Sequence, residues 1–156
     1  MARYEKSQFP TFRLGATWVA TTGVTIEIAN PTGSGRNLRL RKFNVFATAN
    51  IAFTIRRRSA VATGGTSADI TATICPAKFG APASVATAKS FTVAPTAGTN
   101  LDAPIAIQIP TQGGLRDDIS DDTMEPLVLS PGEVLSIDAN GGATVIMNLA
   151  WTEENF

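Results

Sequence analysis

The chain has 156 residues, a length that suits one domain. Thirteen lysines and arginines balance thirteen acids, so the formal net charge is zero, which disfavours a protein that neutralises nucleic-acid phosphate in bulk. There is no histidine, and Cys75 is the single cysteine. Catalytic Ser–His and Cys–His pairs, histidine metal sites, thiolate metal cages and internal disulfides are therefore excluded. We expect no enzymatic activity and no cofactor.

Neither a targeting segment nor a membrane span is expected. The first twelve residues are polar and mixed in charge, without the apolar stretch of a signal peptide. No apolar run approaches the roughly 18 residues needed to cross a bilayer. We therefore expect a protein made in the cytoplasm that binds no membrane.

The two halves of the sequence carry opposite charge. Residues 1–78 hold eleven bases and three acids, whereas residues 79–156 hold two bases and ten acids. Such a division favours complementary contact, either within one molecule whose strands interleave or between neighbouring copies.

The first part of the chain predicts an arm followed by strands. Residues 1–14 are expected to form an extended N-terminal arm, and residues 15–156 a single β-domain. Residues 16–28 read as one long strand or as two strands broken around Gly23. Residues 38–46 read as another strand, in which the parity of the apolar positions changes between Leu40 and Phe43. Such a change indicates a β-bulge or a strand buried on both faces.

The rest of the chain continues the two-residue period of half-buried strands. Alternation is found over residues 51–56, 70–74, 85–93, 105–109 and 145–151. Pro131-Gly132 fits a type II turn. Asn140-Gly141 fits a type I′ turn that would pair residues 134–138 with residues 144–151 in a hairpin. Eight or nine short strands separated by turns predict an all-β fold: a sandwich, a jelly roll or a small barrel. Of these we expect a single β-sandwich or jelly-roll-like domain.

Three arginines in a row, Arg56, Arg57 and Arg58, form the densest charge feature. They suggest a docking or nucleic-acid contact, or a solvated strand end. The chain has no excess of basic residues, and no aromatic residues are interleaved with these arginines. Both observations argue against binding to nucleic acid.

Other polar and aromatic residues give weaker signals. The acids between Asp117 and Asp122 lack the ligand order of an EF-hand, so we expect a solvated loop or pairing with a neighbour's arginines rather than a metal site. Trp151 is in phase with core positions, and Cys75 is expected to be a buried, unreactive thiol. Nothing in the sequence brings Glu27 and Glu133 together as a catalytic pair.

The end of the chain resembles small β-sandwich virion proteins of tailed bacteriophages. The similar segments are residues 125–138, with the Pro-Gly-Glu turn, and residues 141–154, with Trp-Thr-Glu. The family it most resembles is the capsid decoration, or cement, proteins. The resemblance implies a structural virion protein on the outside of the capsid, bound to the major capsid protein, often as a trimer and without catalytic residues. Tail and neck proteins share the same kind of turn.

The sequence therefore leaves two alternative functions. The first is a homo-oligomeric decoration protein that stabilises a phage shell through contacts between subunits. The second is a binding module for a receptor or carbohydrate, associated with a tail, neck or fibre. The predicted interface residues are the basic and aromatic side chains of the arm and the arginine run: Arg3, Lys6, Phe9, Phe12, Arg13, Arg56, Arg57 and Arg58.

Overall fold

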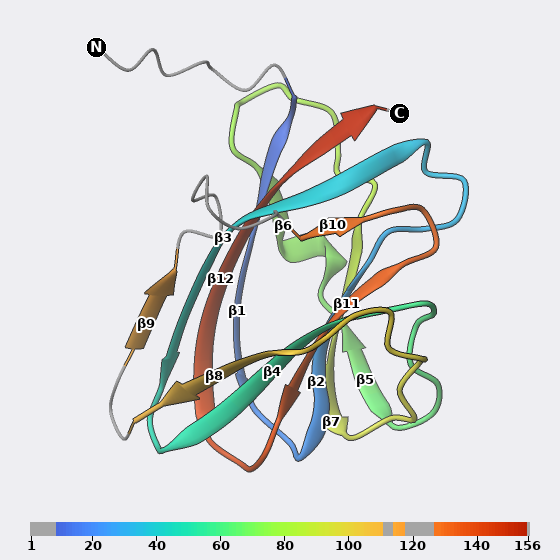
Figure 1. Cartoon of the computed structure of the whole chain (residues 1–156). Coiled ribbons are helices and arrows are strands. Elements are labelled where there is room, and N and C mark those ends of the chain that lie inside the picture. Colours follow the sequence, from blue (N-terminus) through green and yellow to red (C-terminus); the bar gives the residue numbers. More distant parts are fainter. Residues whose placement is uncertain (1–8, 111–113, 118–126, 156) are drawn as a thin grey trace.

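The fold is all-β, with two antiparallel sheets, consistent with a β-sandwich (Figure 1). The computed structural model describes residues 9–110, 114–117 and 127–155. The described part contains one short 3₁₀ turn, η1 (Thr71–Thr73), and no α-helix. No helix in it is long and apolar enough to cross a membrane. The strands are β1 (Thr11–Val19), β2 (Gly23–Ala29), β3 (Arg36–Ala47), β4 (Ile51–Arg58), β5 (Thr66–Asp69), β6 (Ile74–Pro76), β7 (Thr87–Val93), β8 (Ile105–Ile109), β9 (Gly114–Asp117), β10 (Val128–Leu129), β11 (Val134–Ala139) and β12 (Thr144–Asn155).

The larger sheet, sheet A, has the strand order β10-β3-β12-β1-β6, with β9 also paired to β3. The two long central ladders join β12 to β1 and to β3. The strand closest to the end of the sequence therefore lies in the middle of the sheet.

The second layer, sheet B, consists of two three-stranded groups, β11-β4-β8 and β2-β7-β5. The groups meet where β2 lies beside β11: the Asn30 N–H donates to the Glu133 carbonyl at 3.0 Å, and Thr22 bridges Ala139.

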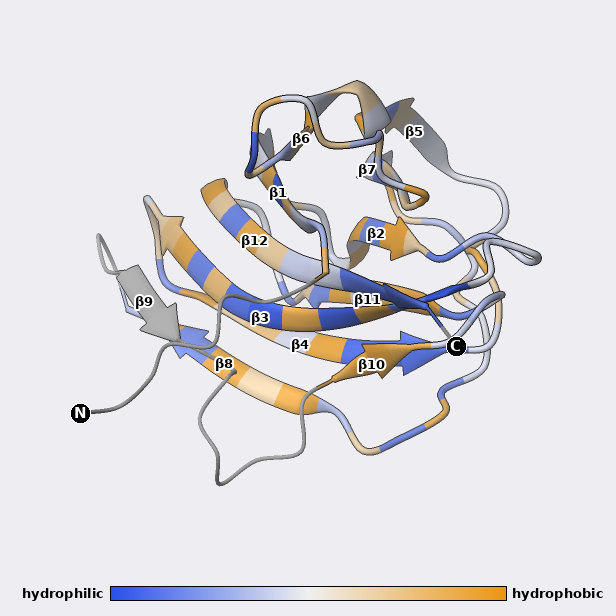
Figure 2. Cartoon of the chain, turned by 90° about the horizontal axis from the view of Figure 1, so that it is seen from above, coloured by the Kyte–Doolittle hydropathy of each residue, from blue (hydrophilic) through white to orange (hydrophobic). Residues whose placement is uncertain are grey.

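The core lies between the sheets because inward side chains of both layers are apolar. Hydrophobic and hydrophilic residues alternate along β3 and β12 (Figure 2). Phe43, Met147, Phe53 and Ile137 are all at most 1% exposed. Ile26 and Ile28 of β2 belong to the same apolar cluster.

A β-bulge in β3 confirms the predicted change of parity. Ala150 of β12 pairs with Lys42, and Trp151 pairs with Leu40, so Arg41 is the extra residue. The bulge lets Leu38 and Leu40 point into the core on one side of it and Phe43 and Val45 on the other.

Most of the predicted strands are present, with breaks where the turns were expected. Residues 16–28 are indeed broken, and the two parts, β1 and β2, lie in different sheets. The Pro131-Gly132 turn is confirmed: Gly132 has φ 90°, and the Glu133 N–H donates to the Ser130 carbonyl at 3.0 Å.

Three expectations were wrong. Residues 70–74 do not form one strand; η1 interrupts them, and the Asp69 carboxylate accepts the Thr71 N–H at 2.8 Å at its start. Hydrogen bonds from Thr71 lower the pKa of Asp69.

The hairpin at Asn140-Gly141 is absent because β11 pairs with β4 in sheet B, whereas β12 lies in sheet A.

The third correction concerns the arm. Residues 11–14 belong to β1, and Phe12 and Leu14 are at most 1% exposed in the core. The β-domain therefore begins at or before Thr11. Of the rest of the predicted arm, residues 9 and 10 are described and residues 1–8 lie outside the described residues.

Candidate functional site

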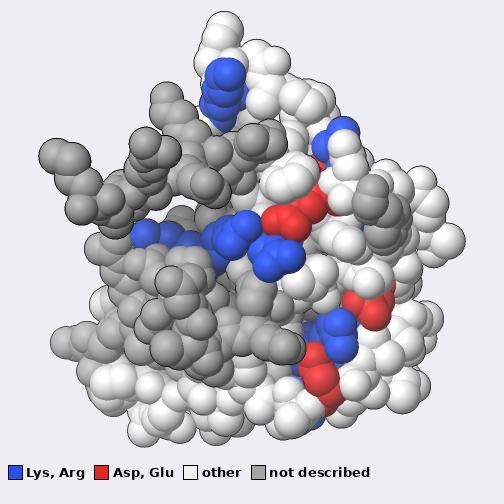
Figure 3. Space-filling view, turned by 45° about the horizontal axis from the view of Figure 1, so that its top comes forward, with Lys and Arg blue, Asp and Glu red and all other residues white. Residues whose placement is uncertain are grey.

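The opposite charges of the two halves meet within one molecule. Each ion pair between described residues joins an arginine of residues 36–58 to an acid of residues 102–154. The pairs are Arg36–Glu153, Arg39–Glu154, Arg41–Glu154, Arg56–Asp138, Arg57–Asp102, Arg57–Glu133 and Arg58–Asp138. Basic and acidic side chains accordingly lie next to one another on the surface in Figure 3. The interleaving of strands predicted as one alternative is confirmed.

Arg58 is an internal residue, only 6% exposed. Its guanidinium donates to Asp138 at 2.6 Å, to Ser136 Oγ at 2.6 Å and to Asn100 Oδ1 at 2.7 Å. A fourth bond, of 2.8 Å, reaches the Gly98 carbonyl. These partners come from β11 and from the connection after β7, so the side chain ties a loop onto sheet B.

Glu27 lies in the same region and is 2% exposed. Both of its carboxylate oxygens accept the Ala62 N–H, at 3.0 and 3.1 Å. Burial raises the pKa of Glu27; the Ala62 hydrogen bond and the charges of Arg58 and Lys89 oppose the shift, and Asp138 adds to it. The carboxylate fastens residues 59–65 to the sheet.

The arginine run is therefore not a free strand end, because each of its members pairs with an acid of the same molecule; its role in docking stays a prediction. As expected from strand geometry, its members face two sides: Arg56 and Arg58 pair with Asp138, whereas Arg57 pairs with Asp102 and Glu133. Glu27 and Glu133 belong to these separate groups and form no pair.

Sequence reasoning gave no role to Glu153, which is 1% exposed. It accepts hydrogen bonds from Ser84 Oγ at 2.5 Å, from the Val85 N–H at 3.1 Å and from Trp151 Nε1 at 3.4 Å, and it pairs with Arg36. The Trp-Thr-Glu ending was a usable signal, because a buried Trp needs an acceptor for its N–H.

One end of the molecule presents exposed aromatic side chains. Phe79 is fully exposed at 104%, and Phe9 is 40% exposed. Both line a groove of about 570 Å³ together with Lys78 and the loop that ends at Pro82. Sequence reasoning named Phe9 and missed Phe79, although its setting between Pro76 and Pro82 indicates an exposed loop.

The other predicted interface residues lie in different parts of the structure or outside the described residues. Phe12 is in the core, where its ring stacks on that of Trp151, so it is not available as an anchor for a neighbour. Arg13 is exposed on the outer face of β1. Arg3 and Lys6 lie outside the described residues.

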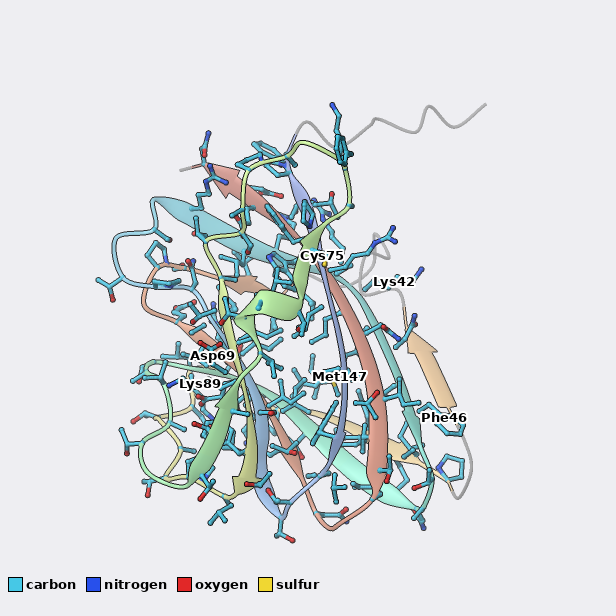
Figure 4. The ribbon with its side chains drawn as sticks, turned by 180° about the vertical axis from the view of Figure 1, so that it is seen from behind. Lys42, Phe46, Asp69, Cys75, Lys89 and Met147 are labelled. Atoms are coloured by element: carbon cyan, nitrogen blue, oxygen red, sulfur yellow. The ribbon has the colours of Figure 1, made fainter. Side chains whose placement is uncertain are left out.

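The outer face of sheet A carries a second groove, of about 330 Å³. Three neighbouring strands line it: β1 with Arg13 and Gly15, β12 with Asn148, and β3 with Lys42 and Asn44. In the register of the sheet, Gly15 is opposite Asn148, which is opposite Asn44. Figure 4 shows Lys42 and Phe46 along β3, and Met147 on β12.

Apolar side chains continue this face beyond the groove. Ile146 is opposite Phe46, and these residues are 45% and 41% exposed. Val19, at the end of β1, is 62% exposed. We call this set, from Arg13 through the two asparagines to Phe46, Ile146 and Val19, the outer face of sheet A.

Two remaining predictions concern Cys75 and the acidic run. Cys75 is exposed, not buried, because it lies on the short edge strand β6 opposite Arg13. The side chains from Asp117 to Asp122 lie outside the description. No group of three or more potential metal-ligating side chains occurs among the described residues.

Comparison with protein-family models, with curated proteins and with solved structures finds no match for this chain.

Proposed function

We propose that the chain is a non-enzymatic structural protein of a tailed-phage virion, a decoration protein on the outside of the capsid. It binds the major capsid protein, forms a homo-oligomer, with a trimer favoured, and stabilises the shell through contacts between subunits. A jelly-roll-like arrangement of the strands and an extended N-terminal arm are part of the same proposal.

The proposal rests on one observation. Phe9 and Phe79 are exposed aromatic side chains that line the same groove, close to the start of β1. Fully exposed aromatic side chains are typical anchors of protein interfaces, which bury them in pockets of the partner. The pairing of arginines with acids inside the molecule leaves such apolar anchors as the prominent surface feature at this end.

The sequence adds two arguments. The closing segment resembles that of decoration proteins, and its Trp151 and Glu153 are both buried. The chain has no histidine for the usual acid–base chemistry.

The test is co-sedimentation of the purified protein with tailed-phage capsids that lack their decoration protein, after its mass in solution has been measured. We expect a homo-oligomer that sediments with capsids. Phe79→Ser should weaken sedimentation at least tenfold, and Val61→Ser, a change at an apolar position that is 48% exposed elsewhere, should not. A monomer that stays in the supernatant would contradict the proposal.

A second candidate is a receptor- or carbohydrate-binding module of a tail, neck or fibre. The observation that favours it is the cross-strand pair Asn44 and Asn148 in an open groove, because amides on one face suit sugar hydroxyls. Specific signal on a glycan array, lost in Asn148→Ala, would establish it.

A further inference from the structure

The chemical character of the outer face of sheet A changes along its strands. Its rows, read along the strands, are basic, then amide, then apolar. We propose that this face binds an extended acidic segment of a partner protein, in which apolar side chains alternate with carboxylates. The inference rests on the proposed function, and it names the surface and the chemistry of the partner.

The basic row attracts carboxylates. Arg13 is exposed and makes no ion pair with the described residues. Farther along, Arg39 and Arg41 share the single carboxylate of Glu154, at 3.0 and 3.2 Å. This face therefore carries more arginines than described carboxylates to pair with them, which favours an acidic partner.

The amide row is open to a polypeptide backbone. A Cβ atom on Gly15 would lie 3.1 Å from Asn148 Oδ1, so glycine leaves the room that this side chain occupies. Glycine inside a strand is unfavourable on its own, and here it lets the Asn148 side chain lie across β1 on the outer face. Asn44 Oδ1 is buried and accepts no hydrogen bond from the described residues. Because that atom is buried, a peptide would meet the exposed amide of Asn148 instead, which can both donate and accept a hydrogen bond.

The apolar row distinguishes a polypeptide from other acidic polymers. Phe46, Ile146 and Val19 would stay uncovered beneath a phosphodiester chain, whereas the apolar side chains of a peptide would bury them. A cavity of about 330 Å³ suits a few residues of an extended segment.

The probe is a labelled ten-residue peptide in which glutamate alternates with leucine, measured by fluorescence anisotropy on the full chain. A matched peptide with glutamine in place of glutamate tests the need for charge. Gly15→Val fills the groove with a residue that favours strands, and Arg13→Ala removes the exposed cation. Lys89→Ala, an exposed cation on β7 of sheet B, is the control variant.

We expect the acidic peptide to bind at low salt, and the glutamine peptide to bind at least tenfold more weakly. Gly15→Val should raise Kd at least tenfold and Arg13→Ala about threefold to tenfold, with Lys89→Ala unchanged. Circular dichroism and thermal melting should confirm that each variant is folded. The same ranking should appear in sedimentation with capsids.

Several results would overturn the inference. One is equal binding of the two peptides, and another is binding that Gly15→Val leaves intact. Tighter binding of a ten-nucleotide DNA strand or of an array glycan through Arg13 and Gly15 would assign the face to those ligands instead. If the chain binds capsids but both variants of this face bind them equally well, the inference fails and the proposed function stands. If the acidic peptide binds as expected but capsids do not, the function fails and the surface assignment stands.

Discussion

The ring of Phe12 stacks on the ring of Trp151, with centroids 6.3 Å apart and planes inclined by 29°. Phe12 lies in the first strand and Trp151 in β12, and the two residues are directly opposite each other in the register of sheet A. Both are at most 2% exposed. The contact joins the two ends of the described chain inside the core.

Phe12→Ala should therefore lower the free energy of unfolding by about 3–5 kcal/mol, because it leaves a cavity beside Trp151. Phe9→Ala, at a 40% exposed position, should cost less than about 1 kcal/mol. Urea denaturation of both variants measures the difference. Equal small losses would show that residues near position 12 belong to an arm after all. Deletion of residues 1–14 should unfold the domain, whereas deletion of residues 1–8 should not.

Arg58→Ala should lower the free energy of unfolding by about 2–3 kcal/mol. The change leaves Ser136, Asn100 and the Gly98 carbonyl without their donor. The loss is at the lower end for a buried network because Arg56 still pairs with Asp138. Arg56→Ala, at a more exposed position, should cost less than about 1 kcal/mol, and similar losses for both variants would contradict this assignment.

Glu27 should make the protein less stable as the pH rises. Burial raises its pKa above the ordinary value of 4.5, so the folded state holds its proton to higher pH than the unfolded state. Its favourable contribution is complete below pH 4.5 and is lost as the pH rises from there through the folded pKa. Glu27→Gln should remove this decline, and melting temperatures of the two proteins between pH 4 and 8 give the comparison. Parallel curves would contradict the role given to burial.

Deletion of Arg41 should leave the domain folded. It removes the extra residue of the bulge, so Leu40 and Lys42 become neighbours, and Leu38 and Leu40 stay in phase with Phe43 on the core side of the sheet. Arg41→Ala keeps the bulge and loses the pairing with Glu154 and Thr152, at a cost of about 1 kcal/mol or less. Circular dichroism and urea denaturation of both variants give the comparison. An unfolded deletion variant would show that the fold needs the bulge itself, and not only the apolar positions on its two sides.

The local patterns of the sequence predicted the strands well, and the failures have a common cause. Alternation located β4 and β8, and the change of parity between Leu40 and Phe43 predicted the bulge. Pairing between distant strands is not encoded locally, so the turn at Asn140 looked like a hairpin although it joins two sheets. In the same way, Arg57 looked like a surface charge because Asp102 and Glu133, far along the chain, are its partners. The groove on sheet A was not predictable because Gly15, Asn148 and Asn44 meet only through the register of three strands.

The central place of β12 in sheet A has a consequence for synthesis of the protein. A ribosome makes this strand after all the others, yet β1 and β3 pair with β12 and not with each other. While residues 144–155 are still being made, both long strands expose unpaired edges and the core lacks Val145, Met147, Leu149 and Trp151. Sheet A can therefore close only after translation has passed residue 155. Until then, the nascent chain depends on its polar turns or on chaperones to avoid aggregation.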